Sequence, residues 1–126
     1  MLSTGGGAPH AIPVSAIVRA GPRRVLLALA LRRESLARLR TDPRCGLTLM
    51  TAGDVACTAY GRARIVQEPM TVSDRVAAIA IDVESIADHM QPDFVLEGPV
   101  RWRWTDAEAR ERDAVIRDAL ARLAGS

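Results

Sequence analysis

Lysine is absent from this 126-residue chain, and all 17 basic residues are arginines. Without lysine the protein cannot form a Schiff base to a lysine amine, which excludes lysine-linked pyridoxal phosphate chemistry. Any site for a phosphate or another anion must therefore use arginine, backbone N–H groups or hydroxyls. Because there are also 15 acidic residues, the formal net charge is only +2, which argues against a nucleic-acid-binding protein.

Cysteine, histidine and long apolar runs are scarce as well. Cys45 and Cys57 lie far apart without metal-ligand spacing, so we expect two small buried side chains. His10 and His89 have no second ligand at a useful spacing, and no metal site is predicted. No apolar run approaches the roughly 20 residues of a membrane span, and the N-terminal residues do not resemble a signal peptide. We expect a cytoplasmic protein without a membrane partner.

Two common enzyme motifs are also missing. The chain has no G-x-S-x-G sequence, so no serine nucleophile of the hydrolase type is predicted. The only run of glycines, Gly5 to Gly7, precedes an expected strand instead of joining a strand to a helix, as a dinucleotide site requires. The sequence motifs therefore identify no catalytic residue.

The residues that are present predict one mostly-β domain spanning 1–126. Apolar residues make up 48% of the chain, which can supply one core. Alternation of side chains predicts strands over 9–19, 24–31, 45–51, 55–67, 76–84 and 100–104, with a shortened strand at 2–4. A short helix is expected over 36–40 with Ser35 as N-cap, and a C-terminal helix from a capping box of Thr105 and Glu108.

The strand expected over 24–31 is apolar on both faces. In a small β domain, a strand buried on both sides suggests the core on one face and a partner or cofactor on the other. Leu26 and Ala28 belong to this second face, which predicts a contact with another copy of the chain.

The segment 31–38 is the strongest candidate for binding an anion. It carries Arg32 and Arg33 where a strand runs into a helix, and Arg38 follows on that helix. Helix N-termini present free N–H groups, and paired arginines can grip a phosphate with two hydrogen bonds each. A solvated basic face with a serine cap would show the same residues, so both interpretations stay open.

Residues 8–66 resemble the flavin-binding split barrels related to pyridoxamine 5'-phosphate oxidase. The matching pieces are Pro9-His10 with Pro13-Val14, the strand 25–31, the segment 39–44 running into 45–49, and residues 60–63. Residues 98–104 resemble the end of the domain in many relatives. The resemblance implies a six-stranded antiparallel split barrel (Greek key) with a short inserted helix and a C-terminal helix. It also implies a homodimer with flavin mononucleotide (FMN) in the groove between subunits.

In this family the flavin ring lies along the strand that matches residues 12–16, and its phosphate lies at the end of the strand that matches 29–35. The resemblance therefore implies these cofactor contacts: Pro13, Val14, Ser15, Leu29, Arg32, Arg33, Ser35 and Arg38. Trp102 could stack on the flavin, or Trp102 and Trp104 could fill the core or the dimer interface. Arg62 and Arg64 could line the same cleft or form a solvent-facing row.

Three functions remain open from the sequence. The first is a flavin- or deazaflavin-dependent oxidoreductase acting on a small molecule. The second is a non-catalytic protein that binds a flavin, a deazaflavin coenzyme or haem. The third is a cofactor-free dimeric interaction protein, which is favoured by Glu34 and Ser35 standing where the family often has Arg-Lys.

Overall fold

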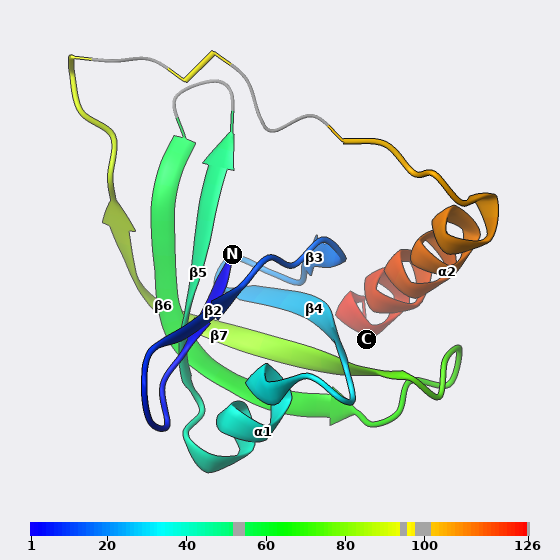
Figure 1. Cartoon of the computed structure of the whole chain (residues 1–126). Helices are drawn as coiled ribbons and strands as arrows, with labels where there is room; N and C mark the ends of the chain where they lie inside the picture. Colours follow the sequence, from blue (N-terminus) through cyan, green and yellow to red (C-terminus); the bar gives the residue numbers. More distant parts are fainter. Residues whose placement is uncertain (52–54, 94–95, 98–101, 126) are drawn as a thin grey trace.

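The computed structural model describes residues 1–51, 55–93, 96–97 and 102–125. These residues form one antiparallel sheet of seven strands, where the sequence predicted six, in the order β2-β1-β5-β6-β7-β4-β3 (Figure 1). The strands are β1 (Leu2–Thr4), β2 (His10–Ile12), β3 (Ile17–Arg19), β4 (Arg24–Ala30), β5 (Arg44–Thr51), β6 (Val55–Gln67) and β7 (Val76–Asp88). The helices are α1 (Glu34–Thr41) and α2 (Ala107–Ala124). Neither described helix is long and apolar enough to cross a membrane.

One short segment, residues 13–16, forces this sheet to curl. It joins β2 to β3, which are the two outermost strands of the sheet. The edges of a flat seven-stranded sheet would lie about 29 Å apart, at about 4.8 Å for each spacing. The chain from Ile12 to Ile17 can reach at most about 18 Å. The sheet therefore bends until its edges approach each other, which gives an incompletely closed barrel of the split-barrel type.

The same segment corrects a prediction, because the sequence indicated one continuous strand over 9–19. Residues 13–16 have no strand pairing, so the chain forms β2 on one edge and β3 on the other. Pro13 explains the break, since it has no backbone N–H to donate to a sheet ladder. Pairing resumes with the backbone hydrogen bond from Ala28 to the carbonyl of Ala16.

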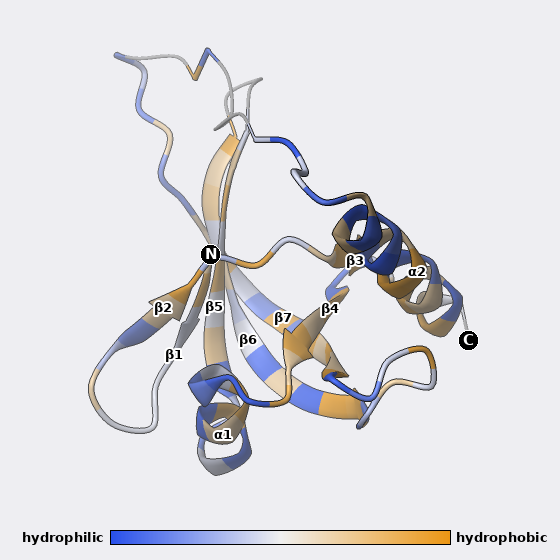
Figure 2. Ribbon diagram, turned by 45° about the vertical axis from the view of Figure 1, so that its right-hand side comes forward, coloured by the Kyte–Doolittle hydropathy of each residue, from blue (hydrophilic) through white to orange (hydrophobic). Residues whose placement is uncertain are grey.

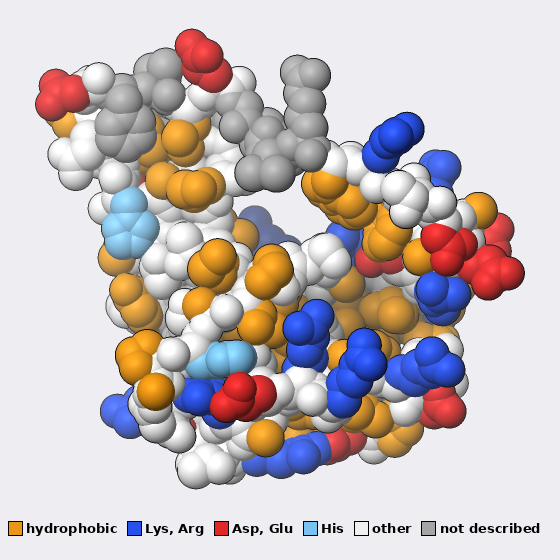
Figure 3. All heavy atoms as spheres, in the orientation of Figure 1, with side chains coloured by type: hydrophobic (Ala, Val, Ile, Leu, Met, Phe, Trp, Pro, Cys, Tyr) orange, Lys and Arg blue, Asp and Glu red, His pale blue; other side chains and the backbone are white. Residues whose placement is uncertain are grey.

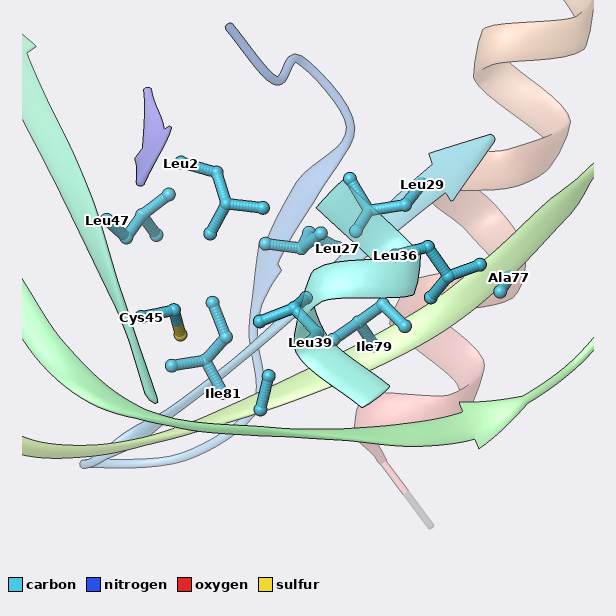
Figure 4. Close-up of a cluster of buried hydrophobic side chains, with 11 residues drawn as sticks. Leu2, Leu27, Leu29, Leu36, Leu39, Cys45, Leu47, Ala77, Ile79 and Ile81 are labelled. Carbon is cyan, nitrogen blue, oxygen red and sulfur yellow. The ribbon is translucent and has the colours of Figure 1, made fainter. Parts of the chain in front are cut away.

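The main core lies inside the curl. Figure 4 shows leucines from β1, β4, α1 and β5 pointing toward one another and toward β7. Leu27 of β4 and Leu36 of α1 are fully buried there. On β7 alternate side chains, Ala77, Ile79 and Ile81, belong to this cluster, as expected for a strand over 76–84.

A second cluster lies on the other face of β4 and β7, and helix α2 covers it. Leu26 of β4 is 3% exposed, and Leu120 of α2 is fully buried in the same cluster. Ala28 also packs there. The sequence predicted that another copy or a cofactor covers this face of β4. This is wrong, because the chain covers it with its own C-terminal helix (Figure 1).

Both helices begin at other residues than the sequence indicated. Helix α1 begins at Glu34, and its N-cap Arg33 makes no side-chain cap hydrogen bond, so Ser35 is not the cap. Helix α2 is capped by Asp106, which accepts a hydrogen bond from the backbone N–H of Glu108 at 2.9 Å. The strand predicted over 100–104 is wrong for residues 102–104, which are not in a strand. Residues 100–101 and the predicted turn at 52–54 lie outside the described residues.

Strands β5, β6 and β7 extend beyond their neighbours as an arm. We define the arm as residues 48–51, 55–60 and 83–88, because β1 pairs with β5 only up to Leu47 and β4 pairs with β7 only up to Asp82. Figure 2 shows hydrophobic colouring along the upper part of this arm. At its base, Gly61 is required by close packing: a Cβ there would lie 2.1 Å from the carbonyl oxygen of Asp82.

Candidate functional site

The junction between β4 and α1 presents two arginines with free guanidinium groups. Arg32 and Arg33 are exposed, and within the described residues neither side chain has an ion pair or a hydrogen bond. The first backbone N–H groups of α1 lie beside them without a side-chain cap. A phosphate is the kind of ligand that uncapped helix N–H groups and free guanidinium groups bind together.

Glu34 does not leave an unpaired negative charge at this junction. Its Oε1 accepts hydrogen bonds from Nε and Nη2 of Arg38, at 3.1 and 3.0 Å. Arg38 also donates from Nη1 to the backbone carbonyls of Gly5 and Ala8. Arg38 is therefore held against the β1–β2 turn, and only Arg32 and Arg33 remain available to an anion.

Ser35 lies on the inner side of the same helix. It is fully buried, and its hydroxyl makes a 3.1 Å hydrogen bond with Nε2 of His10 on β2. His10 Nδ1 is 3.7 Å from Glu34 Oε2. A serine, an imidazole and a carboxylate in this order resemble a nucleophilic triad in atom types. Because Ser35 is inaccessible to a substrate, these three residues link β2 to α1 and do not form a nucleophile.

A hollow of about 420 Å³ joins the free arginines to the edge of the sheet. It is lined by His10, Ile12, Arg32, Arg33 and Glu34. Figure 3 shows arginine side chains gathered on this side of the molecule. The segment 13–15 continues from Ile12 along the chain, and none of its residues lines the hollow.

The other residues suggested by the resemblance are placed differently. Pro13 and Ser15 are exposed, and Val14 packs against the main core. Leu29 is 2% exposed and belongs to that core. Trp102 is 62% exposed and packs edge-on against Trp104, with ring centroids 5.0 Å apart, and it does not line the hollow.

A second groove, which the sequence did not reveal, runs over the outer face of β5 and β6 and holds about 540 Å³. Its floor contains a chain of hydrogen bonds in which Thr58 Oγ1 lies 2.8 Å from both Thr48 Oγ1 and His89 Nε2. Its rim carries an ion pair between Arg62 and Glu84 at 3.1 Å. Alternating threonines on adjacent strands were the available signal, but their meeting depends on the register of the two strands.

Most other charges of the sheet are neutralised by neighbours. A bidentate hydrogen bond from Arg44, together with its backbone N–H, lowers the pKa of Asp42 to about 2. Hydrogen bonding from Arg24, and then Arg64, lowers the pKa of Asp82. Arg64 therefore belongs to a surface ion pair, as one of the two sequence interpretations held. Within the described residues, no group of three or more His, Cys, Asp or Glu side chains could hold a metal ion.

Comparisons with known proteins support the fold. No protein-family model and no curated protein matches the chain. A solved structure from Listeria innocua, titled "Putative Pyridoxamine 5'-phosphate oxidase", is similar with a TM-score of 0.58 and 14% identity, over 70% of this chain and 85% of that one. A conserved hypothetical protein from Mycobacterium tuberculosis is similar with a TM-score of 0.53 and 20% identity, over 77% and 82%. The chain thus has the split-barrel fold seen in these structures.

Proposed function

We propose that this protein binds a phosphorylated flavin such as FMN, with the phosphate between Arg32 and Arg33 at the β4–α1 junction. The observation that carries the proposal is the hollow in which these two unpaired guanidinium groups meet the edge of β2. Arg33 also precedes the uncapped N-terminus of α1, whose N–H groups suit a phosphate.

The residues that follow the hollow suit the flat part of the ligand. Residues 13–15 are outside the sheet ladder, and Pro13 and Ser15 are exposed. The Ser15 carbonyl accepts a hydrogen bond from Arg117 of α2, so we expect the polar edge of a flavin ring to contact the backbone of residues 13 and 14 instead. When bound, a flavin would supply hydride and electron transfer, and the protein would orient it and tune its environment. We infer a flavin- or deazaflavin-dependent oxidoreductase that acts on a small molecule.

Titration with two flavins tests this proposal. FMN carries the phosphate and riboflavin does not, so FMN should bind more tightly to the parent protein. Replacing Arg32 or Arg33 by alanine should weaken FMN about ten- to a hundredfold for each guanidinium that contacts the phosphate, and should leave riboflavin unchanged. Arg23→Ala is the matched control, because Arg23 is exposed on the β3–β4 turn. Equal affinity for FMN and riboflavin would contradict the phosphate site.

A cofactor-free protein is the second candidate, and one observation favours it. Ser35 and Arg38, two of the residues suggested for the phosphate, are occupied by His10, Glu34 and backbone carbonyls. If neither FMN nor riboflavin binds in the titration, the cofactor-free protein is favoured over the flavin-binding one.

We also propose that two copies of the chain associate through the arm. Leu49, Val55 and Ile86 are 38%, 41% and 68% exposed. The strand register places them on one face, because Leu49 lies opposite Cys57 and Ile86 lies opposite Ala59 on β6. This face continues the core through Leu47 and Ala59, and a contiguous exposed apolar patch of this kind marks an interaction site.

A further inference from the structure

His10 lines the hollow beside the two free arginines, where its protonation would change the charge that an anion meets. Its side chain is 22% exposed and lines the same hollow as Arg32 and Arg33. One ring nitrogen, Nε2, is engaged by the buried hydroxyl of Ser35, and the other, Nδ1, lies 3.7 Å from a carboxylate oxygen of Glu34. Because both nitrogens face oxygen atoms that can accept a hydrogen bond, the ring can be held in the same place with or without a second proton.

The charges around this imidazole come from two segments. The junction contributes Arg32 and Arg33, which oppose a further positive charge. Helix α1 contributes Glu34, which favours it, and Arg38, which shares that carboxylate. From β1 the directly opposite residue is Thr4, which is uncharged. Without a ligand, two uncompensated guanidinium groups and one carboxylate therefore line the same hollow as the His10 ring.

A dianion in the hollow reverses this balance. It neutralises Arg32 and Arg33 and adds negative charge beside the ring, so the imidazolium becomes favourable. We propose that His10 is a third, proton-dependent cation of this site, and that binding of a dianion is accompanied by proton uptake on its imidazole. The proposal rests on the proposed function, because it uses the same hollow. It follows that a dianion binds more tightly as the pH falls, since coupling between two sites is reciprocal.

The sharpest test uses sulfate, which remains a dianion across the whole range in which histidine titrates. The two histidine rings are followed by NMR between pH 5 and pH 8.5, roughly the range of imidazole titration, at constant ionic strength with and without sulfate. We expect sulfate to move the midpoint of the His10 titration to higher pH. His89, bonded to Thr58 on the arm, should not move and serves as an internal control. Sulfate affinity should be about tenfold higher at the acidic end.

Two variants make the result specific. His10→Gln retains an amide that can bond to Ser35 but cannot titrate, so its sulfate affinity should be independent of pH. His89→Gln should keep the pH dependence of the parent. Sulfate binding at one affinity throughout would overturn the proton coupling and leave the anion site standing. No sulfate binding at any pH, or binding that survives replacement of both Arg32 and Arg33 by alanine, would overturn the anion site and this inference with it.

Discussion

At the scale of single residues, the pair Glu34 and Ser35 acquires a physical explanation. The family resemblance made both look out of place, because two basic residues often stand there. In this protein Glu34 pairs with Arg38, and Ser35 reaches inward to His10. Together they fasten β2 and the β1–β2 turn to α1. The free positive charge lies directly before this pair, on Arg32 and Arg33.

The two cysteines should differ sharply in reactivity. Burial raises the pKa of the Cys45 thiol to about 11, while Cys57 is half-buried on the arm. At pH 8 only about one Cys45 thiol in a thousand would be ionised, and the thiolate is the reactive form. Because Cys57 lies on the arm face proposed to bind a second copy, the folded protein is alkylated briefly at a concentration below that of association. Peptide mass spectrometry should then show Cys57 modified and Cys45 spared.

Both cysteines should react in denaturant, which controls for peptide recovery. Because the unfolded Cys45 thiol ionises at lower pH than the folded one, the fold should also lose stability as the pH rises toward 11. Rapid modification of native Cys45 at pH 8 would contradict its burial in the core.

At the scale of elements, α2 completes the protein by covering one face of the sheet. Charged side chains of this helix pair with each other: Asp118 with Arg122 on the exposed side, and the partly buried Asp113 with Arg117, which also donates a hydrogen bond to the Ser15 carbonyl. Its inward side chains, Ile116, Leu120 and Leu123, meet the second cluster on β4 and β7. Such an amphipathic helix gains its stability from packing more than from its own propensity.

Leu120→Ala should therefore destabilise the whole domain. Leu120 is fully buried, and removal of a buried leucine side chain costs about 2–5 kcal/mol of unfolding free energy. Val115→Ala is the matched control on the same helix, because Val115 is 48% exposed and should change stability by less than about 0.5 kcal/mol. Both are measured by denaturant unfolding. Equal midpoints for the two variants would show that α2 does not cover the sheet in solution.

At the scale of the whole molecule, the arm is the part that the described residues leave uncovered. Helix α1 and the edge strands cover the main core inside the curl. Helix α2 covers the second cluster on the other face of β4 and β7. The arm projects beyond both, and its face with Leu49, Val55 and Ile86 remains exposed. A small domain buries a limited share of its surface, so association of two copies would stabilise it.

We therefore expect sedimentation at micromolar concentration to show a dimer. Ile86→Asp should convert the dimer to a folded monomer, because burying an unpaired charge in the interface is very costly. Met50→Asp is the control: Met50 is 66% exposed on the same arm, but strand alternation places it on the opposite face from Leu49. A monomeric parent protein would refute the association, and dissociation by Met50→Asp alone would assign it to the other face.

The sequence by itself determined the class of the fold and the chemistry of the candidate site. Period-two alternation along β5, β6 and β7, and the helical spacing of Ile116, Leu120 and Leu123, are local patterns that predict strands and an amphipathic helix. The absence of lysine likewise confines any anion site to arginines, backbone and hydroxyls. These properties follow from the covalent order of residues and need no knowledge of long-range contacts.

Only the tertiary structure decided which arginines are available to a ligand and which apolar faces are covered. Arg32 and Arg38 look alike in the sequence, yet the guanidinium of Arg38 is hydrogen-bonded to Glu34 and to carbonyls of the β1–β2 turn. Leu26 was expected to face a partner, yet it meets Leu120, which lies more than ninety residues further along the chain. Local patterns show that an apolar surface must be buried or that a charge needs a counter-charge. Which residues cover that surface or pair with that charge depends on how the sheet curls, because the curl brings distant parts of the chain together.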